Sequence, residues 1–113
     1  MLINFGMYES LLMFINNYSN HPLILFGAGE FGRKASLYLL TRNVRIDYFC
    51  DNDCQKWHQQ IYGIEVISIE EFYKMDRNTN IIITSSYYDQ IFSQLVKKDL
   101  KTFIIGLLHF IKI

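Results

Sequence analysis

The stretch LILFGAGEFGRKA, residues 23–35, decides the fold of this chain. It begins with four apolar residues that do not alternate with polar ones, which is typical of a strand buried on both faces of a parallel sheet. Gly27, Gly29 and Gly32 then fit the pattern G-x-G-x-x-G, and a helical pattern takes over from Glu30. We therefore expect a strand, a tight turn and a helix. The turn can cradle a nucleotide or can simply connect the two elements.

Apolar periodicity on both sides of this stretch predicts further strands and helices. We expect strands over 23–26, 45–50, 62–66, 80–84 and 102–105, and helices over 30–42, 68–75 and 86–98. Ser68 with Glu71 forms an S-x-x-E capping box, and Ser86 with Asp89 can cap the last of these helices. This order predicts an α/β fold with an open, doubly wound, mostly parallel sheet of about five strands, which is Rossmann-like.

The length and the chain ends suggest one domain over residues 1–113 with a core over 23–105. Residues 7–19 predict an additional amphipathic helix at the N-terminus, and 106–113 form an apolar tail. Both ends carry much apolar surface, so we expect a homo-oligomer or docking to a partner through them. The alternative is that they cover the two faces of the sheet.

Charge and cysteine content exclude several classes of protein. Eleven Lys and Arg balance eleven Asp and Glu, so the chain lacks the basic field that nucleic-acid binding needs. Two cysteines are too few for a disulfide scaffold, and no apolar stretch is long enough for a membrane span. The first residues lack a basic n-region, so we expect a cytoplasmic protein.

The glycine loop is the first part of a candidate binding site. Gly27 permits the tight turn, Gly29 lets the backbone approach a pyrophosphate, and Gly32 lets the helix lie against the strand. Backbone N–H groups and the helix dipole then face an anion. Within the loop, Glu30 could repel a diphosphate and Arg33 could offset that repulsion, although the reading as ordinary surface residues is favoured for both.

An acid follows the second strand in IDYFCDND. Asp51 lies about 20 residues beyond the glycine loop, where a Rossmann fold places the carboxylate that binds ribose hydroxyls. Asp53 is a less well placed second candidate, and turn chemistry is the alternative for the whole segment, Asn52 included.

The loop after the strand over 80–84 should form the far wall of the same crevice, because ligands lie where the strand order reverses. Hydroxyls of Thr84, Ser85, Ser86 and Tyr87 can meet a phosphate or a sugar there, whereas Ser86 can instead be only a helix cap.

Cys50, Cys54 and His58 are spaced by four, but Cys50 ends a strand, so we expect no metal site. Trp57 can stack on a base or can pack at the edge of the core.

Taken together, LILFGAGEFGRKASLYL, IDYFCDNDCQKW, IYGIEVISIEEF and NIIITSSYYDQIFSQL resemble small nucleotide-binding domains of bacterial surface-polysaccharide biosynthesis. These include the N-terminal domain of sialic-acid-type and bacillosamine-type sugar acyltransferases, and domains beside sugar dehydratases and methyltransferases. The resemblance covers about residues 23–105. It implies a phosphate at the glycine loop and a nucleoside at the D-N-D corner. By this resemblance Gly27, Ala28, Gly29 and Gly32 face the phosphate, and Asp51 and Asn52 face the nucleoside. The remaining loop residues that we count as candidates for the binding site are Glu30, Phe31 and Arg33.

The sequence departs from that family where Asn52 replaces a second acid, and no acyltransferase domain follows. We therefore expect a nucleotide-binding module without independent catalysis, holding a UDP-type nucleotide-sugar for a partner enzyme. The first alternative is an NAD(H)-binding domain, either a piece of an oxidoreductase or a redox sensor. The second is a structural or oligomerisation domain without a ligand.

Overall fold

The computed structural model describes residues 22–75, 79–97 and 103–106. Its elements follow the order β1 (Leu23–Phe26), α2 (Glu30–Leu40), β2 (Tyr48–Cys50), the 3-10 helix η1 (Cys54–Lys56), β3 (Gln60–Ile61), β4 (Ile64–Ile67), α3 (Ile69–Tyr73), β5 (Asn80–Ile83), α4 (Tyr88–Val96) and β6 (Phe103–Gly106). The expected helix over 7–19 and, beyond Gly106, the apolar tail lie outside the described residues. Among the residues that are described, no helix is long and apolar enough to cross a membrane.

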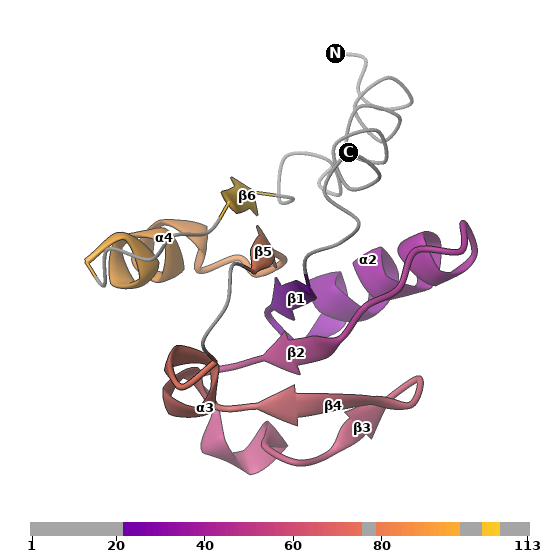
Figure 1. Cartoon of the computed structure of the whole chain (residues 1–113), viewed down its shortest axis with the longest axis horizontal. Coiled ribbons are helices and arrows are strands. Elements are labelled where there is room, and N and C mark those ends of the chain that lie inside the picture. Colours follow the sequence, from indigo (N-terminus) through magenta and orange to yellow (C-terminus); the bar gives the residue numbers. More distant parts are fainter. Residues whose placement is uncertain (1–21, 76–78, 98–102, 107–113) are drawn as a thin grey trace.

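The strands form one sheet in the order β3-β4-β2-β1-β5-β6 (Figure 1). Neighbouring strands are parallel except for β3, which runs antiparallel to β4. The predicted open, mostly parallel sheet is therefore confirmed. The strand order reverses at β1, because the chain continues to β2 on one side of it and reaches β5 on the other. This switch point between β1 and β5 is where such sheets bind ligands.

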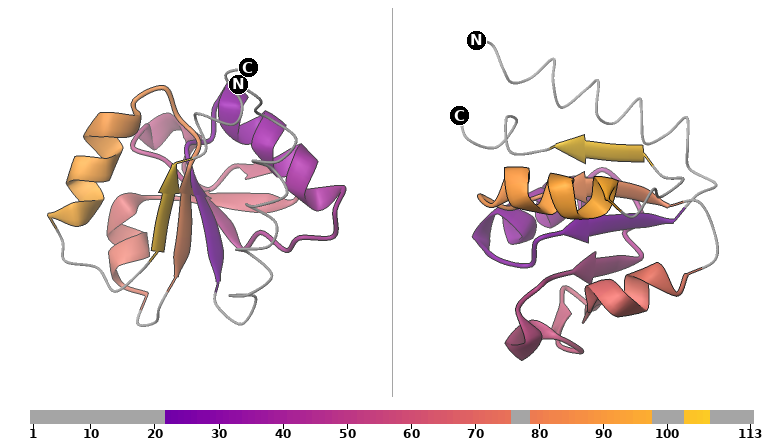
Figure 2. Two further views of the ribbon diagram at one scale, coloured as in Figure 1. Left: turned by 90° about the horizontal axis from the view of Figure 1, so that it is seen from above. Right: turned by 90° about the vertical axis from the view of Figure 1, so that its left-hand side faces the viewer.

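Helices cover both faces of the sheet (Figure 2). Leu23 and Leu25 of β1 belong to the buried cluster that includes Ala35 and Leu39 of α2. Ile24 and Phe26 belong to the cluster on the opposite face, which is built with α3 and α4. Because each face of β1 meets a helix layer, the strand needs apolar residues at every position, which explains its unbroken apolar run.

Several element ends differ from the sequence-based expectation. The second strand begins at Tyr48 instead of Arg45, and α2 stops at Leu40, short of a left-handed Asn43. The single strand expected over 62–66 is wrong at its start, because Tyr62 and Gly63 have positive φ and form the turn between β3 and β4. Turn residues with positive φ are typical of tight hairpins. The short strand β3, which pairs with β4 across this turn, is not among the expected strands.

The two predicted helix caps have different outcomes. The capping box of α3 is confirmed, since the Ser68 hydroxyl accepts a hydrogen bond from the Glu71 amide and the Glu71 carboxylate accepts one from the Ser68 amide. Ser86 does not cap α4, because Tyr87 occupies the N-cap position. Instead, the Ser85 hydroxyl accepts a hydrogen bond from the Tyr87 amide at 3.0 Å. One extra turn residue precedes the helix, which moves the expected cap out of place.

Candidate functional site

A cleft of about 390 Å³ opens at the carboxyl ends of β1, β2 and β5. It is lined by the glycine loop, by the segment that follows β2 and by the loop that follows β5, namely Gly27, Gly29, Glu30, Phe31, Asp51, Asp53, Lys56, Thr84, Ser85, Ser86 and Tyr87. A smaller hollow of about 240 Å³ is lined by Phe26, Gly27, Asp51, Asn52, Ser85, Tyr87, Gln90 and Ile91. The two hollows share four lining residues, so we describe them as one candidate site with a loop side and an α4 side.

Most of the residues expected in the site line one of the two hollows, including Glu30, Phe31, Asn52 and the three residues after β5. Ala28, Gly32 and Arg33 line neither hollow. Arg33 is exposed on α2. The alternative acid Asp53 does line the loop side.

The three loop glycines are needed for different reasons. A Cβ on Gly27, whose φ is +131°, would approach the Thr84 carbonyl oxygen to 2.5 Å. A Cβ on Gly32 would overlap the Gly27 carbonyl oxygen, so α2 packs directly on the loop. The fold itself therefore explains both glycines.

Gly29 is different because its φ is −92° and a Cβ there would meet only the Lys56 ammonium nitrogen, at 3.6 Å. It is the N-cap of α2, and no side chain caps that helix end. The missing side chain leaves space over backbone N–H groups that have no partner inside the helix.

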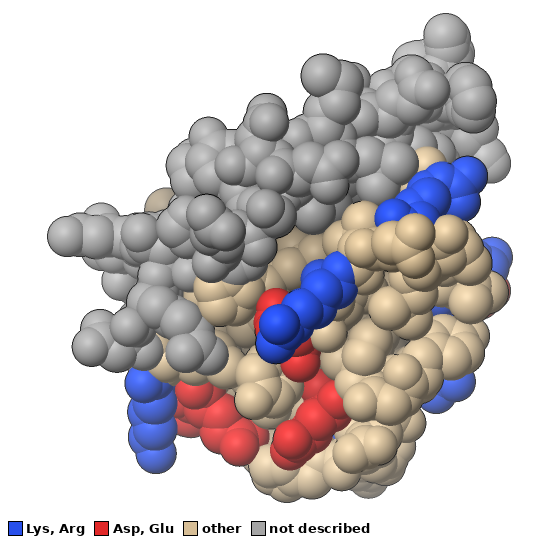
Figure 3. Space-filling model, turned by 45° about the vertical axis from the view of Figure 1, so that its right-hand side comes forward, with Lys and Arg blue, Asp and Glu red and all other residues tan. Residues whose placement is uncertain are grey.

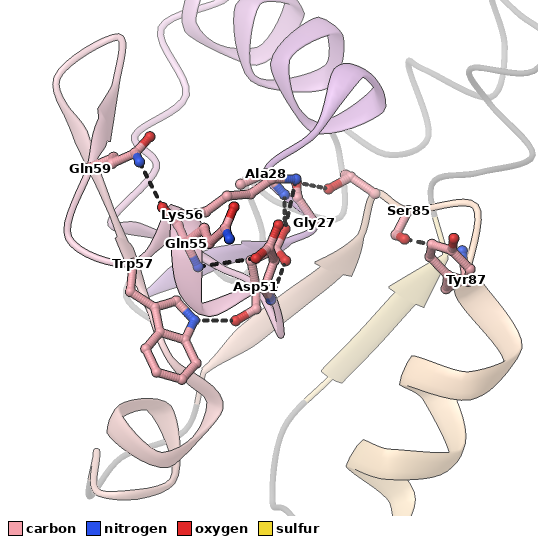
Figure 4. A network of polar contacts seen from close by, with 11 residues as sticks. Gly27, Ala28, Asp51, Gln55, Lys56, Trp57, Gln59, Ser85 and Tyr87 are labelled. Carbon is pink, nitrogen blue, oxygen red and sulfur yellow. Dashed lines mark hydrogen bonds and ion pairs between the residues drawn. The ribbon is translucent and has the colours of Figure 1, made fainter.

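Asp51 ties the segment after β2 to the glycine loop (Figure 4). Its Oδ2 accepts a hydrogen bond from the Ala28 amide at 2.8 Å, and its Oδ1 accepts one from the Asp53 amide at 2.8 Å. Its side chain is only 15% exposed. The Ala28 amide is thus already hydrogen-bonded to the protein's own carboxylate. The backbone amides that remain for a ligand are those that follow Ala28, at the uncapped start of α2.

The segment after β2 is held in place by its own turn chemistry. The Asp53 carboxylate accepts a hydrogen bond from the Gln55 amide and begins η1. The Trp57 indole N–H donates to the Asp51 carbonyl at 2.7 Å, and its ring packs against the α2-side core cluster. Of the two roles proposed for Trp57, stacking on a base and packing at the edge of the core, the structure shows the packing.

Lys56 is the site residue that the sequence analysis missed. Its ammonium lies 3.7 Å from Asp51 Oδ2 and lines the cleft beside Gly29. No motif marks it, since a lysine in a polar loop is an ordinary surface residue. Only η1, which turns the chain back over the glycine loop, brings it there.

Two contacts close the remaining sides of the site. The buried Thr84 hydroxyl donates to the Gly27 carbonyl at 2.9 Å and so joins the ends of β1 and β5. The Asn52 amide exchanges hydrogen bonds of 3.1 and 3.3 Å with Gln94 of α4. Tyr87 stands 66% exposed between the two hollows and offers an aromatic surface.

Cys50, Cys54 and His58, which are spaced by four in the sequence, do not form a metal-binding cluster in the structure. Cys50 is buried at the end of β2, whereas Cys54 is exposed on η1. Burial raises the pKa of the Cys50 thiol far above its usual value, with nearby Asp51 adding to the shift. Within the described ranges, no group of three or more His, Cys, Asp and Glu could hold a metal ion. On the face in Figure 3, Lys and Arg side chains of the described residues are spread apart among neutral and acidic ones.

Comparison with known proteins gives a family and a fold. The family model "C2185-like, N-terminal" matches residues 19–103. No curated protein matches.

Two solved structures are similar. RSP, a Rex-family repressor, aligns at 15% identity with a TM-score of 0.55, over 89% of this chain and 59% of that one. RSP in complex with beta-NADH aligns at 14% identity with a TM-score of 0.51, over 88% and 62%. This chain therefore spans less than two thirds of the length of these repressor chains. The likeness confirms the Rossmann-like fold. It does not support the more specific resemblance to nucleotide-binding domains of surface-polysaccharide biosynthesis.

Proposed function

The chain belongs to the C2185-like N-terminal family, and from this premise and the cleft we propose that it is a nucleotide-binding module whose ligand is NAD(H). The observation that carries the proposal is Gly29. The fold does not require a glycine there, yet its missing side chain leaves room beside the uncapped end of α2 and the Lys56 ammonium. A diphosphate fits such a place because backbone N–H groups and the helix dipole favour an anion.

One observation supports NAD(H) over a UDP-sugar, and a second supports a diphosphate ligand of either kind. One similar structure is a complex with beta-NADH. In addition, the site has two sides, with a polar loop side and an α4 side whose walls include Phe26, Tyr87 and Ile91. A ligand with a diphosphate between two ring systems, which NAD(H) and a UDP-sugar both are, can use both sides. In this proposal the Asp51 oxygens, which accept one amide hydrogen bond each, also accept from a ribose hydroxyl, since each has a further lone pair.

We further propose that the module has no catalytic activity of its own and acts in the cytoplasm with a partner enzyme or a second copy of the chain. The ends expected to make such contacts are 7–19 and the apolar tail 106–113, and apart from Gly106 they lie outside the described residues.

Calorimetric titration with NADH, NAD⁺, UDP-glucose and UDP tests the proposal. We expect NADH or NAD⁺ to bind to the unaltered protein, and Gly29→Val to weaken that binding more than about tenfold, because its methyl groups fill the phosphate position. Thr41→Val, at the exposed other end of α2, is the matched control and should bind normally. Thermal melting establishes that both variants are folded.

The competing readings give different results. Binding of UDP-glucose in preference to NADH would keep the module but replace its ligand. An unaltered protein that binds none of these nucleotides would overturn the proposal in favour of a structural domain.

A further inference from the structure

Lys56 extends from η1 over the glycine loop (Figure 4). Its side chain is 38% exposed, so the ammonium is accessible from the cleft. The nearest carboxylate oxygen, Asp51 Oδ2, is 3.7 Å away, which is longer than a hydrogen bond. An ammonium group has three donors, so Lys56 keeps donors for another anion.

An anionic oxygen already lies at this edge of the cleft. Asp51 Oδ2 accepts a hydrogen bond from the Ala28 amide at 2.8 Å and faces Lys56 on its other side. The protein's own carboxylate thus shows that a loop amide and the ammonium converge on one negatively charged oxygen. A phosphate oxygen entering beside Gly29 would meet the same ammonium.

The charges that line the loop side make Lys56 decisive. Glu30, Asp51 and Asp53 are acidic lining residues, and Lys56 is the basic one among the described residues there. Glu30 is partly offset by an exposed ion pair of 3.4 Å with Lys34 on the next turn of α2. A diphosphate entering this cleft is repelled by the remaining carboxylates, so its affinity depends on the one lining cation.

We propose that Lys56 is a phosphate-binding residue of this site, and that a diphosphate oxygen replaces Asp51 Oδ2 as its closest anionic partner. This inference rests on the proposed function, because it assigns a residue to the same ligand. It also gives η1 a role, since η1 carries the only cation of the cleft lining within the described chain.

Trp57 makes the exchange observable. It is the only tryptophan of the chain, it follows Lys56 directly, and its indole donates to the Asp51 carbonyl. A shift of the Lys56 ammonium from Asp51 to a phosphate changes the surroundings of this indole. Inorganic pyrophosphate is a suitable probe because it does not absorb where tryptophan emits.

The test compares Lys56→Met, which keeps the aliphatic stem, with Lys56→Arg, which keeps the charge. We expect Lys56→Met to weaken NADH binding roughly ten- to a hundredfold, as for the loss of a charged hydrogen bond, and Lys56→Arg to retain most of the affinity. Lys97→Met removes the same charge from an exposed position after α4 and should bind within about twofold of the unaltered protein. Pyrophosphate should change Trp57 emission in the unaltered protein and not in Lys56→Met.

The outcomes separate this inference from the proposed function. If Lys56→Met binds NADH as the unaltered protein does while Gly29→Val does not, the module stands and the role of Lys56 is wrong. Equal losses in Lys56→Met and Lys56→Arg would point to packing by the stem and would also overturn the inference. If the unaltered protein binds neither NADH nor UDP-glucose, both proposals fail together.

Discussion

At the scale of single residues, Gly32 shows how closely α2 packs against the loop before it. A Cβ on Gly32 would overlap the carbonyl oxygen of Gly27, which is backbone and cannot rotate away. We expect Gly32→Ala to lower the free energy of unfolding by about 1 to 3 kcal/mol or more, because overpacking a close contact destabilises the fold by this amount. Urea denaturation measures the loss.

Gly29→Ala is the matched comparison, because its nearest neighbour would be a flexible lysine end at 3.6 Å. It should cost clearly less stability than Gly32→Ala. Equal stability of the two variants would contradict the packing described for Gly32.

The sequence identified the glycines and Asp51, and it assigned each glycine a different task. The structure agrees for Gly27, whose φ is positive, and for Gly32, where a Cβ would overlap the Gly27 carbonyl oxygen. Asp51 has the expected position, and its carboxylate binds the Ala28 and Asp53 amides of the protein itself. Which hydrogen-bond partners a carboxylate finds depends on the path of the neighbouring loops, which no local pattern encodes.

At the scale of elements, His58 joins the connection after η1 to β4 and α3. Its φ is 66°, and its Nδ1 lies 3.0 Å from Glu65 Oε2 while its Nε2 lies 3.8 Å from Glu71 Oε1. The hydrogen bond to Glu65, with the charge of Glu71, raises the pKa of His58 above its usual value. The imidazolium form of His58 therefore stabilises the contact of the segment after η1 with β4 and α3.

The pH dependence follows from the direction of that shift. The contribution of His58 to stability is complete below its unfolded pKa and is lost as the pH rises through its higher folded pKa. His58→Asn tolerates the left-handed backbone but cannot titrate. We expect the difference in melting temperature between the unaltered protein and His58→Asn to be larger at about pH 5.5 than at about pH 8.5.

Glu71 stays ionised at the lower of these two pH values, because its hydrogen bond with the Ser68 backbone lowers the pKa of Glu71. A difference in melting temperature that is the same at both pH values would contradict the role of the His58 imidazolium.

Element types were more predictable than element ends. The apolar runs gave β1 and β5, and the S-x-x-E spacing gave the start of α3, because these signals are local. The predicted start of α4 was wrong, and so was the predicted strand start at Tyr62, which lies in the β3–β4 turn. The end of a helix or strand depends on where the chain must turn to bring the next strand into register, and local propensity does not fix that position.

At the scale of the whole molecule, Cys50 reports on cooperative unfolding. It is fully buried in the core cluster between the sheet and the helices α3 and α4, whereas Cys54 is exposed. In a Cys54→Ser variant, we expect a thiol reagent to modify Cys50 only as fast as the domain opens, and modification of the unaltered protein to begin at Cys54. Labelling kinetics with mass spectrometry measures both rates.

A bound ligand should slow that opening. At a free ligand concentration about a hundred times Kd, the stabilisation is about 2.7 kcal/mol, so labelling of Cys50 should slow about a hundredfold. Rapid modification of Cys50 under native conditions would show that the end of β2 opens locally and that the molecule does not unfold as one unit.

The sequence by itself determined the doubly wound architecture and the position of the glycine loop. Unbroken apolar strands separated by amphipathic helices can bury their surfaces only as a sheet covered on both faces, and glycines must stand where two backbones touch. The tertiary structure alone decided which loop amide Asp51 binds, that Gly29 is the open glycine, and that Lys56 reaches it. These facts join segments far apart in the chain, and their contacts exist only after β1, β2 and β5 have paired and brought their carboxyl ends to one edge.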